Sequence, residues 1–294
     1  MNKRKSIGSP IEIDRSGWKK VLKRVSERII EDNIPIISAG VAFYAFLAIF
    51  PGIMVLFSIY GLTLDAQSAE QQIARLAELM PEETISIIER RVNNLMETSA
   101  RALGWGTVFG ILIALWSANK GIKSLFTGLD VTYRVENSRG IIKQNALTLA
   151  FTLGTIIVII VSLTFIVLLP VLVNTIGMPG IIDSLTTWFR WPLLGMIVIS
   201  AISLIYKYGP ARETPGFRWV VLGATVATIV WLLASWGFSV YVNNFGNLGE
   251  IYGSLSAVVI MLFWLFISSF IILAGGELNY ATEVYAKNRL EVSE

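Results

Sequence analysis

The stretch SLSAVVIMLFWLFISSFIILAG, residues 254–275, decides the fold. It is 22 residues long and contains no Asp, Glu, Lys or Arg. About 20 helical residues cross the roughly 30 Å hydrocarbon core of a bilayer, and a charge near the middle of such a helix costs about 2.5–3.5 kcal/mol on insertion scales. The stretch therefore predicts a membrane-spanning helix.

Five other stretches have the same character, and they cover residues 36–61, 102–118, 145–171, 191–206 and 219–240. All 24 Lys and Arg and all 21 Asp and Glu lie outside the six stretches. Charged residues make up 15% of the chain, against about 25% in a soluble globular protein. We therefore expect an all-α fold: a polytopic membrane protein built as a six-transmembrane-helix bundle with amphipathic surface helices.

The positive charges predict how this bundle is oriented. Six spans put both chain termini on one side of the membrane, and the segments on that side hold 19 of the 24 Lys and Arg. Because cytoplasmic connections are enriched in Lys and Arg, both termini are expected in the cytoplasm. The predicted organisation is a cytoplasmic segment at residues 1–35, a transmembrane domain at 36–275 and a cytoplasmic tail at 276–294.

The N-terminal segment contains a predicted amphipathic helix over residues 16–31. Its apolar residues recur at helical spacing and most of its cations lie elsewhere. Such a helix is expected at a membrane surface, with anionic lipid headgroups as its partner. The expected contact residues are Trp18, Lys19, Lys20, Lys23, Arg24 and Arg28. The alternative is a helix that packs on the ends of the bundle. Nucleic acid is a third partner of basic residues, and it fits a chain committed to the bilayer poorly.

Two other connections are also predicted to be helical. Residues 120–134 carry apolar side chains at helical spacing, which favours a second surface helix joined to the preceding span through Gly121. Residues 62–101 favour a helical hairpin on the outer face, with Pro81 between its two helices. The apolar stripe of this hairpin either packs on the bundle or belongs to a lid over a cavity.

The composition excludes several kinds of active site. The chain has no His and no Cys, so it cannot build a His general base, a Ser-His-Asp triad, a thiol nucleophile or a His or Cys metal ligand. It has no nucleotide-binding motif, and we expect no enzyme activity, no cofactor and no metal site. Pro51, inside the first stretch, is expected to kink or break that helix. In a membrane protein a broken span points to a substrate pathway.

Three blocks of the sequence resemble the signatures of the YihY/BrkB family of bacterial membrane proteins. The first consists of DN at residues 32–33, AGVAFYAFL at 39–47 and FP at 50–51. The second consists of WSA at 116–118 with Gly121 and Tyr133, and the third runs from YGSL at 252–255 through Trp264 to GELN at 276–279. The blocks follow the order of the family and extend over nearly the whole chain.

The resemblance implies six spans in a bacterial plasma (inner) membrane. The family has carried the label ribonuclease BN. The chemistry of this chain opposes that label, because a metal-dependent phosphodiesterase needs a cluster of metal ligands. Members of the family have been linked to virulence, to envelope lipids and to export of compatible solutes. The resemblance therefore implies no single activity.

Two functions remain after these exclusions. The first is a transporter or translocator of lipids or small solutes across or within the cell envelope. The second is a non-transporting membrane scaffold or envelope-assembly factor, and a ribonuclease or lipid hydrolase comes last. For the first function, the expected pathway residues are Asn33, Tyr44, Pro51, Trp116, Ser117, Tyr252, Glu277 and Asn279. The sequence is compatible with a homo-oligomer but does not indicate one.

Overall fold

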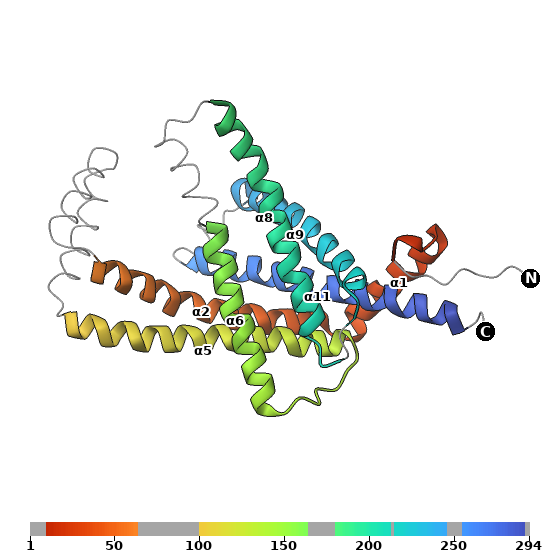
Figure 1. The fold of residues 1–294 in the computed structure, drawn as a ribbon, viewed down its shortest axis with the longest axis horizontal. Coiled ribbons are helices and arrows are strands. Elements are labelled where there is room, and N and C mark those ends of the chain that lie inside the picture. The colour runs from red at the N-terminus through yellow and green to blue at the C-terminus, as the bar shows by residue number, and fades with distance from the viewer. Residues whose placement is uncertain (1–9, 64–99, 164–179, 213–214, 246–254, 292–294) are drawn as a thin grey trace, which may run out of the picture. The chain divides into compact units, whose positions relative to one another are not determined.

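The computed structural model describes residues 10–63, 100–163, 180–212, 215–245 and 255–291. Every regular element within these ranges is helical, and no strand occurs among them. The expected all-α fold is confirmed. In order, the elements are the 3-10 turn η1 (Pro10–Glu12) and the helices α1 (Arg15–Glu31), α2 (Ile34–Thr63), α5 (Ala100–Thr132), α6 (Ile141–Leu163), α8 (Gly180–Tyr208), α9 (Phe217–Phe245) and α11 (Ser256–Glu291) (Figure 1).

Each of the six predicted spans overlaps one of the long helices α2, α5, α6, α8, α9 and α11. In the part of the chain that the structure describes, three helices are long and apolar enough to span a membrane by themselves: Ile141–Ser162, Phe217–Val242 and Ser256–Lys287. A fourth span results when α1 and Ile34–Ile49 are counted together as one bent helix. The number of six spans stays a prediction. The hairpin predicted over 62–101 falls outside the described residues except at its two ends.

The chain forms two compact units. One unit consists of Met1–Tyr44 and Asn119–Glu294, and the other is Ala45–Ala118. The first unit holds α1, the beginning of α2, the end of α5 and the helices α6, α8, α9 and α11. The second unit holds the remainder of α2 and of α5. All of the contacts described below lie within the first unit.

Helix α11 is the centre of the first unit. Helix α9 packs along α11, α8 packs along α9, and α1 packs on the C-terminal half of α11 (Figure 1). The buried core joins residues from several helices, among them Ile34 of α2, Leu129 of α5, Tyr206 of α8, Val220 of α9 and Leu273 of α11. The apolar side chains of these helices therefore meet around the later turns of α11.

Two glycines allow α9 and α11 to approach closely. A Cβ atom added to Gly223 of α9 would collide with the carbonyl oxygen of Gly275 and with the side chain of Asn279, both on α11. Small residues let the backbones of neighbouring membrane helices pack against each other. The amide of Asn279 completes the junction: the Gly223 N–H donates to its Oδ1 at 2.8 Å, and its Nδ2 donates to the Val220 carbonyl at 3.3 Å.

Helix α5 corrects one prediction. The sequence favoured a span that ends near residue 118 and a separate surface helix over 120–134, whereas the structure has one helix of 33 residues, about 50 Å long at 1.5 Å per residue. The reason is packing. Leu125, Phe126 and Leu129 are buried, and Leu125 and Leu129 belong to the core with Leu273 of α11. The apolar stripe thus faces the protein rather than a membrane surface.

A bend separates α1 from α2. The two helices meet at an angle of 65°, and Asn33 at the junction has the positive φ of 51°. Asn tolerates this left-handed conformation better than most residues. Helix α2 continues from Ile34 to Thr63, so it is not broken at Pro51, and a kink at Pro51 stays a prediction. The 65° change of direction lies before the predicted span, at residues 32–33.

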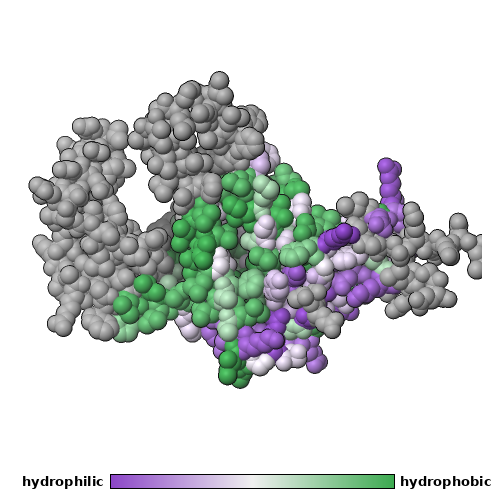
Figure 2. Space-filling view, viewed as in Figure 1, coloured by the Kyte–Doolittle hydropathy of each residue, from purple (hydrophilic) through white to green (hydrophobic). Residues whose placement is uncertain are grey.

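Large apolar side chains are exposed along α6 and α9. Examples are Ile157 and Ile160 on α6 and Leu233 and Trp236 on α9. Figure 2 shows hydrophobic residues gathered over α6 and α8, and hydrophilic residues toward the side where α1 lies. Extended apolar surfaces of this kind mark contact with a membrane or with another protein. Their location on span-length helices fits a membrane protein.

Candidate functional site

A buried ion pair joins α1 to α11. Arg28 of α1 is 5% exposed and Glu277 of α11 is fully buried, and the distance from Arg28 Nη1 to Glu277 Oε2 is 3.7 Å. This distance is too long for a direct hydrogen bond. The Arg28 guanidinium also lies over the ring of Tyr280, 4.4 Å from its centroid. The pair is thus close in space but incompletely bonded.

Helical spacing explains why Arg28 is buried. Arg28 follows Val21 by seven residues, which places both on the same side of α1. Val21 packs against Leu278 and Ala281 of α11. Helix α5 also packs closely against α11 next to Glu277, because a Cβ atom added to Gly276 would lie 3.0 Å from Leu129. Packing of α1 and α5 on α11 therefore encloses Glu277 on both sides.

A second carboxyl group faces Glu277. Asp32 ends α1 as its C-cap residue, and its carboxyl is a neighbour of the Glu277 carboxyl. Its Oδ1 is 3.7 Å from Nη2 of Arg134, and the same nitrogen is 3.4 Å from Oε2 of Glu31. We call Arg28, Glu31, Asp32, Arg134 and Glu277 the charge cluster. It combines three carboxyl groups with two guanidinium groups.

Several buried atoms of the charge cluster have no hydrogen-bond partner within the described part of the protein. They are Nε and Nη1 of Arg28, Oδ2 of Asp32 and both carboxyl oxygens of Glu277. Buried polar atoms are satisfied in about nine cases out of ten, and a buried unpaired group costs about 1–3 kcal/mol or more when it is charged. The concentration of such atoms at one place marks the charge cluster as the candidate site.

A row of stacked side chains leads away from the charge cluster. The Tyr280 ring, under Arg28, meets the Tyr133 ring edge to face with 5.9 Å between centroids. The guanidinium of Arg212 lies over Tyr133 at 4.1 Å, and its Nη1 is 2.8 Å from Oε2 of Glu283. Burial raises the pKa of Tyr133, so its hydroxyl stays neutral. The row thus holds two cations against two aromatic rings.

The segment that carries Arg212 is fixed to α5 and to the chain after it. The backbone N–H of Ala211 donates to Oδ1 of Asp130 at 2.7 Å. Arg139 donates to the carbonyl oxygens of Tyr208 and Gly209 at 3.0 and 2.8 Å. These bonds satisfy carbonyls at the end of α8, which a helix end leaves without partners. The position of Arg212 therefore depends on contacts between distant parts of the sequence.

Three of the predicted pathway residues lie at or beside the charge cluster. Glu277 belongs to it, and Asn33 follows Asp32 at the bend, with an exposed side chain. Asn279 is buried two residues after Glu277, but its amide is used to join α9 to α11. Glu277 therefore has the chemistry of a site, whereas Asn279 positions helices.

The other predicted pathway residues lie elsewhere in the same unit, in the other unit or outside the described residues. Tyr44 lies 11 residues after Asn33 on α2, about 16 Å along the helix. Trp116, which is 59% exposed, and the buried Ser117 lie in the unit Ala45–Ala118. Pro51 lies in the same unit, and its side chain is outside the described residues, as is the whole of Tyr252. The pathway formed by these residues stays a prediction.

The six predicted lipid-contact residues differ in exposure. Lys19, Lys20, Lys23 and Arg24 are exposed, whereas Arg28 is buried in the charge cluster. Trp18 is half-buried and packs on the C-terminal part of α11. The side of α1 that carries Val21 and Arg28 thus packs on the bundle, as in the alternative considered from the sequence. The exposed basic side remains available to lipid headgroups, and that contact stays a prediction.

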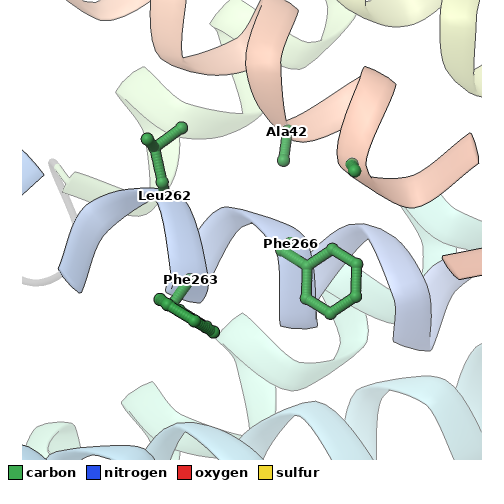
Figure 3. Close-up of a pocket in the computed structure, with 5 residues that line it drawn as sticks. Ala42, Leu262, Phe263 and Phe266 are labelled. Atoms are coloured by element: carbon green, nitrogen blue, oxygen red, sulfur yellow. The ribbon is translucent and has the colours of Figure 1, made fainter. Parts of the chain in front are cut away.

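One pocket lies between α2 and α11, and the side chains that line it are all apolar. It has a volume of about 300 Å³ and is lined by Ala39 and Ala42 of α2 and by Leu262, Phe263 and Phe266 of α11 (Figure 3). Figure 3 shows Ala42 on α2 opposite Phe266 on α11. These side chains offer no polar group to a ligand. The pocket therefore has the chemistry of a hydrocarbon contact and is separate from the charge cluster.

The sequence matches the family of the virulence factor BrkB over residues 25–293. The chain belongs to the BrkB family. The match includes every member of the charge cluster. No solved structure matches this BrkB-family chain.

Two kinds of relatives carry different names. The ribonuclease-like protein YfkH of Bacillus subtilis is 30% identical over 82% of this chain and 87% of its own length. A UPF0761 membrane protein of Paraburkholderia xenovorans is 26% identical over 91% of this chain and 61% of its own length. A UPF0761 membrane protein of Acinetobacter baylyi is 24% identical over 93% of this chain. The chain spans 64% of the length of the Acinetobacter protein, so these UPF0761 relatives are longer proteins.

The family description and the UPF0761 names support a membrane protein and name no catalytic activity, whereas the ribonuclease-like name belongs to YfkH. The geometry offers nothing specific to a nuclease, because no three Asp or Glu side chains gather to hold a metal ion among the residues that the structure describes. The charge cluster escaped the sequence interpretation except for Glu277 and, in another role, Arg28. The signal that could have found it is the seven-residue spacing between Val21 and Arg28.

Proposed function

We propose that this BrkB-family protein is a transporter or translocator of lipids or small solutes across or within the bacterial cell envelope. It would act in the plasma (inner) membrane with both termini in the cytoplasm. The observation that carries the proposal is the charge cluster, in which the buried carboxyl of Glu277 and the buried guanidinium of Arg28 keep polar atoms without partners.

The cost of such a cluster is the first argument. Each buried ion loses several kcal/mol of hydration, and an apolar pair of similar volume is often as stable or more stable. A membrane protein that needs only to hold its helices together gains little from an incompletely bonded pair. Ionisable groups at this location in membrane proteins commonly belong to pathways for substrates, ions or protons.

The exposed side of α1 supports a lipid substrate or a lipid contact. Four cations, Lys19, Lys20, Lys23 and Arg24, are exposed on this helix, and Leu22 is exposed beside them. Basic residues next to a membrane attract anionic headgroups, at about 1 kcal/mol for each Lys or Arg near the surface. A headgroup held here would lie on the same helix as Arg28.

A second candidate function is a membrane scaffold for envelope assembly. One observation favours it: α1, α9 and α11 are joined tightly, through Val21 against Leu278 and through the Asn279 amide against α9. A tightly joined bundle fits a protein that presents its surface to a partner. This candidate leaves the unpaired atoms of the charge cluster without a role.

Reconstitution in liposomes tests the proposal. We would follow the movement of labelled phosphatidylglycerol between leaflets and the release of labelled glycine betaine, with the wild type and with Glu277→Gln, Pro51→Ala and the exposed control Glu136→Gln. The proposal expects at least one activity in the wild type. It expects a loss in Glu277→Gln and in Pro51→Ala, with expression unchanged, and normal activity in Glu136→Gln.

The outcomes separate the candidates. Normal flux in both Glu277→Gln and Pro51→Ala would remove these residues from the pathway. No flux of either probe, from protein shown to be folded and inserted, would put the scaffold in first place. Degradation of RNA by the pure protein, abolished by a substitution in this chain, would contradict both candidates.

A further inference from the structure

We propose that Asp32 and Glu277 together bind one proton, and that this proton is the coupling ion of the transport proposed above. The inference therefore rests on that proposed function and names its energy source. It starts from a shortage of positive charge beside a buried carboxyl group.

The charge count is the first step. The charge cluster has two guanidinium groups, on Arg28 and Arg134, against carboxyl groups on Glu31, Asp32 and Glu277. Arg134 is shared between Glu31 and Asp32. Arg28 is then left as the partner of Glu277, at a distance beyond hydrogen bonding. The three carboxyl groups thus exceed the two guanidinium groups by one, and the fully buried member of the three is Glu277, from which water is excluded.

The geometry of the two carboxyl groups is the second step. They are neighbours in the charge cluster, and Oδ2 of Asp32 and both oxygens of Glu277 meet no donor in the described part of the chain. Two carboxylates that share one site cannot both remain ionised at low cost, and a shared proton resolves the conflict. A protonated carboxyl would donate to the other one, which satisfies both.

All neighbouring charged groups are compatible with this assignment. Arg28 faces Glu277 from α1, Asp32 from the bend after α1, and Arg134 from the chain just after α5. Tyr133, just after α5, is a buried titratable group on which the charge of Glu277 acts. No neighbour among them is a lysine or a third buried carboxylate. The arrangement thus has room for one proton and no obvious second site.

A proton fits better than a metal cation. A sodium, magnesium or calcium ion needs several oxygen ligands around it, and the three carboxyl groups of the charge cluster, like the other acidic side chains that the structure describes, are not arranged to hold a metal ion. The Arg28 nitrogen, 3.7 Å from a Glu277 oxygen, would also repel an ion placed there. A proton needs one donor oxygen and one acceptor, which are both present.

Binding and release of the proton would change the distance between α1 and α11. Uptake transfers H⁺ from a hydronium ion to a carboxylate oxygen and leaves water, and no other bond changes. The neutral Glu277 then holds Arg28 weakly. Release of the proton restores the carboxylate, which attracts Arg28 and draws α1 toward α11. Because α1 continues into α2 through the bend at residues 32–33, this movement reaches the membrane-spanning helix.

Infrared difference spectroscopy tests the site without any substrate. Pure protein in liposomes is compared at acid and alkaline pH, and the absorbance of protonated carboxyl groups is measured for the wild type, Glu277→Gln, Asp32→Asn and the exposed control Glu136→Gln. We expect both site variants to lose the signal of one carboxyl group per chain that titrates apart from the exposed carboxyls. The control is expected to keep it.

The result that would overturn the inference is a wild-type signal in both site variants. Loss of the signal on addition of NaCl but not KCl at constant pH would assign the site to sodium instead. Asp32→Asn removes the less buried member of the pair, so it covers the case in which Glu277→Gln fails to fold. A normal proton signal in protein that moves neither probe would reject transport and keep the proton site. Movement of either probe without the titrating carboxyl signal would reject the proton site and keep transport.

Discussion

Arg28 of α1 is a buried cation whose nearest counter-charge is equally buried. Removing one member of such a pair leaves the other charge in a medium that cannot solvate it, and this costs about 3–5 kcal/mol. Exposed pairs on the same helix behave differently, because water solvates both partners. Lys23 and Glu27, 3.7 Å apart and largely exposed, are such a pair. The two cations therefore allow a direct comparison.

We expect Arg28→Met to lower the free energy of unfolding by about 3–5 kcal/mol and Lys23→Met to change it by less than about 1 kcal/mol. The measurement is equilibrium unfolding in mixed micelles. The double variant Arg28→Met with Glu277→Gln should recover part of the loss, because neither charge then remains alone. The loss should also shrink at acid pH, where Glu277 takes up a proton. Equal effects of the two single substitutions would show that Arg28 is not buried against Glu277.

The sequence could single out Glu277 because it follows a long charge-free stretch. It could not supply the partners. Arg28 belongs to a helix whose other cations are exposed, so composition placed it at the lipid surface. Arg134 reaches Glu31 across 103 residues of sequence, and no local pattern predicts such a contact. The charge cluster is a product of tertiary packing between segments far apart in the chain, which local sequence patterns do not reveal.

At the scale of elements, the junction of α9 and α11 depends on glycine. Gly223 of α9 has no room for a side chain beside Gly275 and Asn279. Gly237, on the same helix, has nothing within 4 Å of the place where its Cβ would be. Both residues lie in a helix interior, so their intrinsic helix propensities cancel in a comparison.

We expect Gly223→Ala to destabilise the protein by about 1–3 kcal/mol, the usual cost of overpacking. Gly237→Ala should be neutral or slightly stabilising, because alanine favours the helix by up to about 1 kcal/mol. Thermal unfolding of both variants in detergent is the measurement. A greater loss in Gly237→Ala than in Gly223→Ala would contradict the close approach of α9 and α11.

The positions of the long helices could be predicted because charges are absent from apolar runs of span length. The ends of helices could not. Helix α5 continues to Thr132 because its later turns pack against buried residues such as Leu273. The sequence showed only an amphipathic stripe and not the residues against which it packs. The bend after α1 was also missed, since Asn33 at positive φ leaves no composition signal as strong as a proline.

For the whole molecule, the prediction of six spans and cytoplasmic termini can be tested with thiol labelling, since the chain has no Cys. Single variants Lys20→Cys, Glu82→Cys and Lys287→Cys are treated in intact cells with a membrane-impermeant thiol reagent. We expect label only on Glu82→Cys, and on the other two after the membrane is opened. Label on one terminus but not the other would require an odd number of spans.

The length of α11 has an electrical consequence. Glu277 follows Ser256, where the helix begins, by 21 residues, or about 32 Å, close to the roughly 30 Å thickness of the hydrocarbon. In the predicted topology, in which α11 enters the membrane near Ser256, the carboxyl would therefore lie near the opposite edge of the transmembrane electric field, on the side of the chain termini. A proton that reaches it from the side of the chain termini crosses almost none of the membrane voltage. One that comes from the far side crosses nearly all of it, at about 2.3 kcal/mol per 100 mV. The voltage dependence of proton binding thus reports the side from which the site is filled.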